Sequence, residues 1–217
     1  RAFNGTTISP RLHGTAIAHL FAGTFARRRE TTRVVVADIF SGERSSAGST
    51  YALVRALDWL ASRNLPVINV SLAGPRNSVV AATIQRLNAR GHVIVAAAGN
   101  DGPAAPPVFP GAYQNVVAVT AVDDRRQIYR YANRGSHVDF SARGVNVPAI
   151  NARGDIVAAT GTSFAAPVVA ARLAMRLRSV DPAAARQAIA ALEAEAQDLG
   201  APGRDTIYGS GLVPDAP

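Results

Sequence analysis

The middle of the chain alternates apolar runs with amphipathic segments, and this pattern constrains the fold more than any other feature. Val67–Ser71 and Val93–Ala97 are short, nearly continuous apolar runs, whereas Asn77–Arg90 between them has helical periodicity and stops at Gly91. Continuous apolar runs indicate strands that are buried on both faces, because a half-exposed strand alternates apolar and polar residues. The order strand, helix, strand therefore predicts parallel βαβ units and an α/β fold.

Segments on either side extend this pattern. Arg33–Phe40 contains three consecutive valines and is predicted to be another buried strand, and His13–Ala26 and Thr50–Arg63 are predicted helices. Shorter strands are expected in the second half of the chain, at Val116–Ala121, Val138–Ser141, Asn146–Ile150 and Asp155–Thr160. A final helix is expected from Asp181, because an aspartate N-cap followed by proline is a helix-start signal.

Length and composition exclude several classes of protein. The 217 residues, without an internal repeat or linker, predict one domain over residues 1–217. No apolar run is long enough to span a membrane, and the absence of cysteine excludes disulfides and zinc–thiolate sites. The net charge is +8 and every basic residue is an arginine. These arginines are scattered and lack interleaved aromatics, so we expect a solvated surface; nucleic-acid binding would instead require strongly salt-dependent DNA affinity.

One stretch combines features that nucleophilic catalysis requires. Ser163 lies among small residues in Gly161–Pro167, directly before the alanine-rich run Val168–Arg178, which is predicted to be helical. At a helix start its N–H would be free to bind an anion, and Pro167 cannot donate to its carbonyl. The alternative is a serine N-cap in front of an ordinary core helix. A hydrolase elbow of the form Gly-x-Ser-x-Gly is excluded, because Ala165 occupies the second glycine position.

Two further residues could take part in such chemistry. His13 opens the first predicted helix, and Asn100 follows the strand Val93–Ala97 at the start of Asn-Asp-Gly. Each has an ordinary alternative: a polar helix start for His13 and a turn for Asn100. A histidine can accept the proton of a serine, and an asparagine amide can donate to a developing oxyanion.

Several stretches together resemble the subtilisin-like serine proteases, or subtilases, from about Leu12 to Val213. The stretches are, in family order, Leu12–Ala18, Val67–Pro75, Val93–Gly102, Gly161–Pro167 and the tail segments Ala196–Gly200 and Tyr208–Val213. The resemblance implies a subtilisin-like three-layer sandwich with a mostly parallel central sheet and helices on both faces. It also implies a serine endopeptidase that hydrolyses peptide bonds through an acyl-serine intermediate, with a polypeptide substrate.

The family's functional positions transfer onto matching residues. Ser163 corresponds to the nucleophile, His13 to its general base and Asn100 to the oxyanion-hole donor. The residues that correspond to substrate-binding positions are Ser71, Leu72, Ala73 and Gly74 on one edge, Ser46, Ala47 and Gly48 on the other, and Ala97, Ala98, Gly99, Asp101 and Val108 around the pocket. An extended peptide would lie between the two edges by β-augmentation, although ordinary loops remain the alternative for both.

The pocket before the scissile bond is expected to be small. Ala73 replaces a common glycine at its rim, and Val108 occupies a floor position where smaller residues are common. These side chains would disfavour large aromatic residues, whereas Asp101 would modestly favour a basic one.

The chain departs from the family in lacking an aspartate at the expected place. The family aspartate lies on a strand roughly thirty residues before the histidine, but twelve residues precede His13 and none is acidic. Asp38 corresponds to a different family position. We expect a second chain, from the N-terminal part of the same precursor, to supply the aspartate and to be held non-covalently. Its strand would lie between Arg33–Phe40 and Val67–Ser71. The alternatives are a strand swapped in from Arg1–Ser9, or an impaired homologue acting as a peptide-binding or scaffold protein.

The remaining expectations concern ligands and location. The stretch Gly23–Arg29 follows the histidine helix, where subtilases often bind calcium, but it lacks an oxygen-rich ligand set. We therefore expect no metal and no cofactor. The family resemblance leads us to expect a protein that is secreted or located in a bacterial cell envelope.

Overall fold

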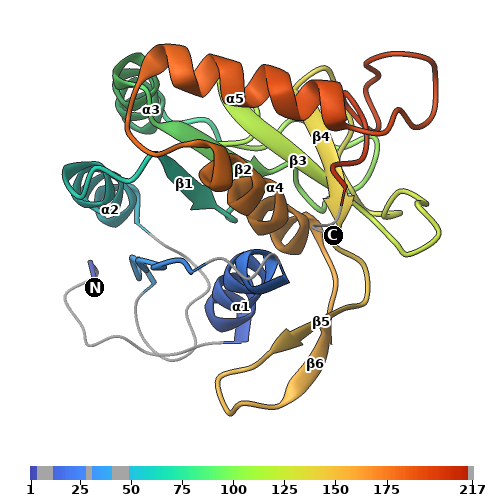
Figure 1. Cartoon of the computed structure of the whole chain (residues 1–217), viewed down its shortest axis with the longest axis horizontal. Coiled ribbons are helices and arrows are strands. Elements are labelled where there is room, and N and C mark those ends of the chain that lie inside the picture. The colour runs from blue at the N-terminus through green and yellow to red at the C-terminus, as the bar shows by residue number, and fades with distance from the viewer. Residues whose placement is uncertain (4–11, 28–30, 41–48, 215–217) are drawn as a thin grey trace.

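A four-stranded parallel sheet forms the centre of the molecule in the computed structural model, which describes residues 1–3, 12–27, 31–40 and 49–214 (Figure 1). The strand order is β1 (Val67–Val70), β2 (Val93–Ala97), β3 (Val116–Val122) and β4 (Val138–Arg143). All three neighbouring pairs are parallel. The apolar runs predicted these strands to within two residues at each end, because strands covered on both faces leave a continuous apolar signal.

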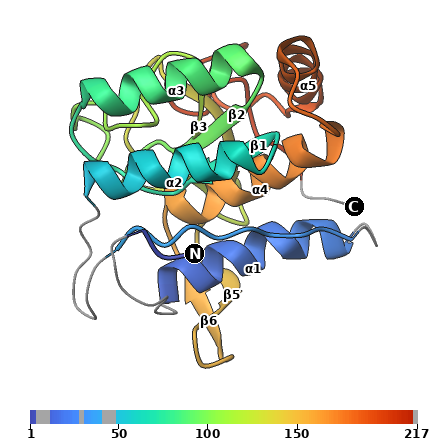
Figure 2. The same cartoon turned by 90° about the vertical axis from the view of Figure 1, so that its left-hand side faces the viewer.

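Helices cover both faces of this sheet (Figures 1 and 2). On one face, α2 (Thr50–Ser62) and α3 (Ser78–Arg90) pack against Ile68 of β1 and Ile94 of β2. On the other face, α4 (Thr162–Arg176) and α5 (Pro182–Glu195) pack against side chains of β2, β3 and β4. The expected three-layer sandwich is confirmed, and none of the helices in the described part of the chain is both long and apolar enough to cross a membrane.

Local capping signals fix where the helices begin and end. The Asn77 side chain accepts hydrogen bonds from the backbone N–H groups of Val79 and Val80 at the start of α3. Gly91 ends that helix in the left-handed conformation, at φ 101°. At α5, Asp181 accepts a bond from the N–H of Ala184. These three ends lie where the sequence predicted them.

The helix α1 (Leu12–Arg27) lies against α4 and connects the sandwich to a projecting hairpin (Figure 1). The hairpin consists of the antiparallel strands β5 (Val147–Ile150) and β6 (Ile156–Ala159). Ala16 and Leu20 of α1 pack against apolar side chains of the hairpin. This packing places the amino-terminal end of α1 near the amino-terminal end of α4.

The prediction of a buried strand at Arg33–Phe40 was wrong. Residues 31–37 form no strand; a parallel bridge joins Asp38 to Ala2, and Phe40 also takes part in an isolated bridge. Val34 and Val36 are 37% and 50% exposed. A run of valines favours extended backbone, but a strand also needs neighbouring strands on which to form hydrogen bonds, and these are non-local.

Candidate active site

Ser163 is the second residue of α4, where its amide points away from the helix. The N-cap is Gly161, with φ 143°, which has no side chain of its own to cap the helix. The N-cap interpretation of Ser163 is therefore wrong, because a cap residue lies before the first helical position. Within the described residues the Ser163 N–H has no acceptor, as expected for the first turn of a helix. A free N–H here is available to an anion.

The carbonyl of Ser163 is bound by a second serine. Pro167 lacks the N–H that would otherwise bond this carbonyl within the helix. The hydroxyl of Ser71, which directly follows β1, donates to it at 2.8 Å. The Ser71 hydroxyl in turn accepts a bond of 2.9 Å from the Asn69 side-chain amide. These bonds fix the start of α4 against the carboxyl end of the sheet.

Asn100 follows β2 and is held by Thr162, the residue before Ser163. Its Oδ1 accepts from the Thr162 N–H at 2.9 Å and from the Thr162 hydroxyl at 3.0 Å. With Oδ1 occupied by two donors, Nδ2 is the atom left to donate, and it has no acceptor within the described residues. A local turn explains this side chain less well, because its bonds reach 62 residues along the chain. Asn100 Nδ2 and the Ser163 N–H are thus two donors without an acceptor among the described residues, and Thr162 links the residues that carry them.

His13 lies at the start of α1 and meets the segment that carries Ser163. Its ring packs edge-on against Phe164, with 5.5 Å between ring centroids. Burial lowers the pKa of His13 below its usual value. No hydrogen bond joins the ring to Ser163 Oγ, whose contact with the Ser71 carbonyl is 3.5 Å long, and no acidic partner contacts it within the described residues. The structure therefore packs His13 against Phe164, the residue after Ser163, where burial favours the neutral imidazole, and no carboxylate among the described residues orients the ring.

The residues that correspond to substrate-binding positions lie around this centre, with one set outside the described residues. Gly74 and Phe109 exchange two backbone hydrogen bonds of 2.9 Å, which join the Ser71–Gly74 edge to the loop that carries Val108. Val108 Cγ2 lies 2.7 Å from the position that a Cβ would occupy on Gly99, so the two segments are in close contact.

The other members of this set differ in exposure. Ala97 and Ala98 are buried, whereas Ala73 and Asp101 are exposed and Leu72 is half-buried. The opposite edge, Ser46–Gly48, falls outside the described residues.

Sequence reasoning missed two residues that organise the site, Thr162 and Asn133. Thr162 orients Asn100, and Asn133, which is fully buried, accepts from the Asp101 N–H at 2.8 Å and donates to the Pro106 carbonyl at 3.1 Å. Thr162 could have been identified from the sequence, because it directly precedes Ser163. No local signal identified Asn133, because its partners lie about thirty residues away. Nowhere in the described residues do three or more His, Cys, Asp or Glu side chains gather as metal ligands would.

Comparison with known proteins agrees with this geometry. The sequence profile of the Subtilase family matches residues 7–211. Subtilisin DY from Bacillus licheniformis is 34% identical over 212 residues, which cover 93% of this chain and 75% of that protein. Minor extracellular protease Epr from Bacillus subtilis (strain 168) is 32% identical over 173 residues, or 79% of this chain. The match spans only 27% of Epr.

Solved structures share the fold at lower sequence identity. A lanthipeptide protease superposes with a TM-score of 0.82 at 22% identity, covering 99% of this chain and 79% of that one. The prenylagaramide maturation protease PagA gives a TM-score of 0.77 at 24% identity, covering 94% of this chain and 80% of that one.

Proposed function

Because this chain belongs to the subtilase family, we propose that it acts as a serine endopeptidase with Ser163 as nucleophile. The proposal is carried by two donors that have no acceptor among the described residues, the N–H of Ser163 and Nδ2 of Asn100, whose side chain is bonded to the neighbouring Thr162. An acyl transfer develops negative charge on the carbonyl oxygen, and fixed donors at that place lower the barrier. An inactive peptide-binding homologue is not favoured, because binding alone needs neither the free donors nor the adjacent histidine.

The reaction proceeds in two halves. His13 accepts the proton of Ser163 Oγ as the oxygen attacks the scissile carbonyl, and the oxyanion binds the Ser163 N–H and Asn100 Nδ2. The intermediate collapses, the amine leaves with the proton from His13, and the acyl group stays on Ser163. Water then repeats the sequence, with His13 as base, and releases the acid.

The substrate is an extended polypeptide segment that lies along Ser71–Gly74. Backbone hydrogen bonds to an edge of this kind give affinity with little dependence on sequence. The residue before the scissile bond enters a pocket bounded by Ala73, Gly99 and Val108. The contact of Val108 with Gly99 supports a shallow pocket that favours small side chains over aromatic ones. We place the protein outside the cytoplasm, in line with the extracellular protease Epr.

The carboxylate that orients His13 comes from a further polypeptide segment. Residues 1–217 then form one peptidase domain that is completed by a segment from the N-terminal part of the same precursor. The lack of an acidic contact to His13 within the described residues supports this proposal. The chain has no cysteine, so such a segment would be held non-covalently.

Casein hydrolysis by the protein purified from its natural source tests the proposed activity. The chain with Ser163→Ala should lose hydrolysis, because no other group replaces the attacking oxygen. The matched control is Ser62→Ala, since Ser62 lies at the exposed end of α2 and bonds only the local Trp59 carbonyl. Equal loss in both variants, or full activity in Ser163→Ala, would contradict the proposal.

A further inference from the structure

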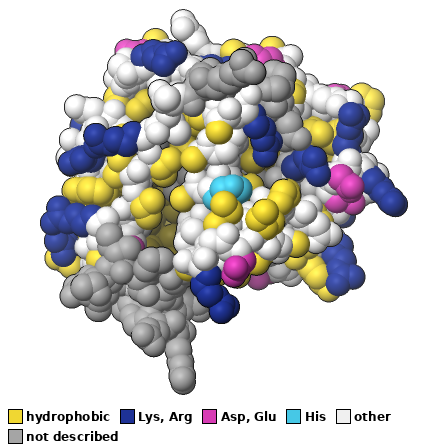
Figure 3. Space-filling view, turned by 60° about the horizontal axis from the view of Figure 1, so that its bottom comes forward, with side chains coloured by type: hydrophobic (Ala, Val, Ile, Leu, Met, Phe, Trp, Pro, Cys, Tyr) yellow, Lys and Arg dark blue, Asp and Glu magenta, His cyan; other side chains and the backbone are white. Residues whose placement is uncertain are grey.

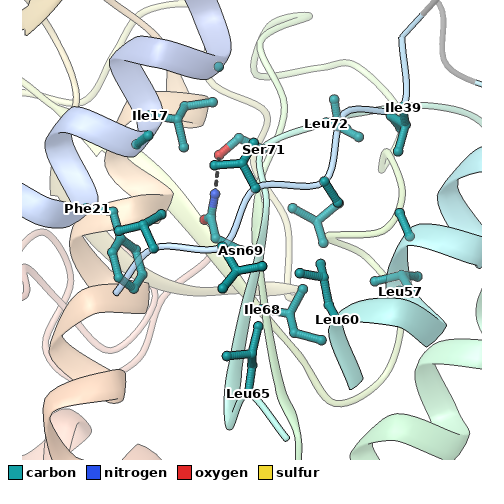
Figure 4. Close-up of a pocket in the computed structure, with 18 of the residues that line it drawn as sticks. Ile17, Phe21, Ile39, Leu57, Leu60, Leu65, Ile68, Asn69, Ser71 and Leu72 are labelled. Atoms are coloured by element: carbon teal, nitrogen blue, oxygen red, sulfur yellow. Dashed lines mark hydrogen bonds between the residues drawn. The ribbon is translucent and has the colours of Figure 1, made fainter. Parts of the chain in front are cut away.

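The edge Ser71–Gly74, along which the substrate is proposed to lie, continues the chain from β1 toward α3. Hydrophobic side chains surround a hollow on the face that carries α1 (Figure 3). Ser71 and Leu72, the first residues of the edge, line the pocket on this face (Figure 4). Farther along, only Gly74 and Asn77 among residues 73–77 make backbone hydrogen bonds within the described part of the chain. The position of the edge therefore depends on the partners of these two residues.

Both partners come from one loop, residues 106–113, which we call the Val108 loop. Gly74 exchanges two backbone hydrogen bonds of 2.9 Å with Phe109. The hydroxyl of Tyr113 accepts a bond of 2.8 Å from the Asn77 N–H and donates a bond of 2.8 Å to the Asn77 carbonyl. A single side chain thus binds both polar groups of the Asn77 backbone. The edge and the Val108 loop are consequently joined at two points.

Tyr113 is itself firmly held. Its ring packs against that of Phe109, with 4.5 Å between ring centroids and 40° between ring planes. Tyr113 also packs against the apolar cluster that α2 and α3 form with the sheet. Its carbonyl accepts a hydrogen bond of 3.2 Å from the N–H of Val116, the first residue of β3. The hydroxyl therefore reaches Asn77 from a side chain that the core and the sheet keep in place.

The side chain of Asn77 makes different contacts from its backbone. Its Oδ1 accepts from the N–H groups of Val79 and Val80 at the start of α3. Its Nδ2 donates to the Thr50 hydroxyl at 3.2 Å. The side chain therefore caps α3, whereas the backbone of the same residue binds Tyr113. Substitutions at Asn77 and at Tyr113 can consequently separate the stability of α3 from the position of the edge.

From these contacts we propose that Tyr113 is a positioning residue that sets the specificity of the pocket before the scissile bond. The inference rests on the proposed function, which identifies this pocket. Ala73 and Val108 bound the pocket from the two joined segments, so the separation of these segments is its width. The Gly74–Phe109 contact alone would allow the edge to pivot about one residue pair. The second contact, at Asn77, prevents this rotation and keeps Ala73 at a fixed distance from Val108.

The rigidity of these walls matters because the pocket is proposed to reject large side chains. Steric rejection requires walls that do not yield, since a wall that moves aside removes the clash. Tyr113 makes neutral hydrogen bonds, and the net contribution of one such bond corresponds to about a 2- to 10-fold change in an equilibrium. We expect a change of this size in the discrimination between small and aromatic residues. In this role Tyr113 acts through Ala73 and Val108, and not on the substrate itself.

Tyr113→Phe tests the inference, because it removes the hydroxyl and keeps the ring. The kcat/KM ratio for matched peptides with Ala or Phe before the scissile bond should fall about 2- to 10-fold. The fall should come from a lower KM for the Phe peptide, with kcat for the Ala peptide unchanged. Tyr208→Phe is the matched control, since Tyr208 is half-buried in the carboxyl-terminal tail and its hydroxyl has no hydrogen bond among the described residues. An unchanged ratio in Tyr113→Phe, or an equal fall in the control, would overturn the inference.

Asn77→Ala distinguishes positioning from stability. This variant loses the α3 cap and keeps the backbone that binds Tyr113, so its urea midpoint should fall while the Ala to Phe ratio stays constant. A ratio that shifts as much as in Tyr113→Phe would assign the effect to the start of α3 and would overturn the inference.

Peptide binding to the chain with Ser163→Ala, measured by fluorescence anisotropy, separates this inference from the proposed function. Adding Tyr113→Phe should lower the affinity for the Ala peptide relative to the Phe peptide by the same factor as in the kinetic ratio. A shifted binding ratio, without hydrolysis by the unsubstituted protein, would refute only the proposed function. Hydrolysis with unchanged binding and kinetic ratios would refute only the role of Tyr113.

Discussion

The hydroxyl of Ser71 donates a 2.8 Å hydrogen bond to the carbonyl of Ser163, across 92 residues of sequence. Pro167 makes this contact possible, because its missing N–H leaves the carbonyl free. The bond connects the end of β1 to the start of α4, so it helps to fix the position of Ser163 relative to the sheet. The first prediction follows from it.

Ser71→Ala should lower the free energy of unfolding by about 1–3 kcal/mol, because the Ser163 carbonyl loses its donor in a largely buried place. Ser71 is 6% exposed, so water replaces the hydroxyl poorly. Urea unfolding measures the change, with Ser62→Ala as the matched exposed control. A loss no greater than that of the control would contradict the structural role of this bond.

Asn100→Ala should lower kcat with little change in KM, because the amide acts on the transition state and not on the bound substrate. The expected loss is about 10²- to 10³-fold, the range already known for the oxyanion donor of subtilisin itself. Steady-state kinetics on a peptide substrate measure it. An unchanged kcat would remove Asn100 from the mechanism.

Thr162→Val should lower kcat about tenfold, because Asn100 Oδ1 keeps the Thr162 N–H but loses the hydroxyl. Thr162→Ser retains a hydroxyl and should recover most of the rate. The same kinetic assay separates positioning from simple destabilisation. If kcat falls equally in Thr162→Ser and Thr162→Val, the hydroxyl does not orient Asn100.

Val108→Gly should shift specificity toward larger residues before the scissile bond. Removing the isopropyl group opens the space beside Gly99, and each methylene accommodated in an apolar pocket is worth about 1–3 kcal/mol. Ratios of kcat/KM for matched Ala and Phe peptides measure the shift. A wild-type preference for Phe, or an unchanged ratio in the variant, would show that Val108 does not limit the pocket.

The protein should be less stable at pH 5.5 than at pH 7.5. Burial lowers the pKa of His13, His92 and His137. In the unfolded chain the histidine pKa values are near 6.5, so below about pH 7 the unfolded chain binds more protons than the folded protein does. The free energy of unfolding therefore decreases as the pH falls, until the pH drops below the folded-state pKa values. Urea midpoints at the two pH values measure the effect.

His92→Asn provides a control for this pH dependence. The Asn amide can still donate to the Leu65 carbonyl that His92 Nδ1 contacts at 2.8 Å, but it does not titrate. The variant should therefore lose less stability between pH 7.5 and 5.5. Equal stability of the unsubstituted protein at both pH values would contradict the burial of these histidines.

The sequence predicted the parts of this structure that depend on local patterns. The four parallel strands and the ends of α3 and α5 follow from apolar runs and capping residues, which act over a few positions. Arg33–Phe40 shows where this reasoning stops, because its valines indicate a strand but cannot supply a pairing neighbour.

The candidate site was predictable in part for the same reason. Pro167 indicated a free carbonyl on Ser163, but not that Ser71 would bind it. Asn100 was identified by its motif, whereas its orientation depends on Thr162, a contact made only in the fold. The positions of His13 and Ser163, 150 residues apart, likewise follow from the packing of α1 on α4.

Covalent labelling of the native protein by a fluorophosphonate, read by mass spectrometry, tests the central claim that Ser163 is an activated nucleophile. We predict one adduct per chain, located on Ser163, and a strong reduction in its rate of formation in His13→Ala. A folded protein that takes up no label at Ser163, or that labels equally fast without His13, would contradict the account.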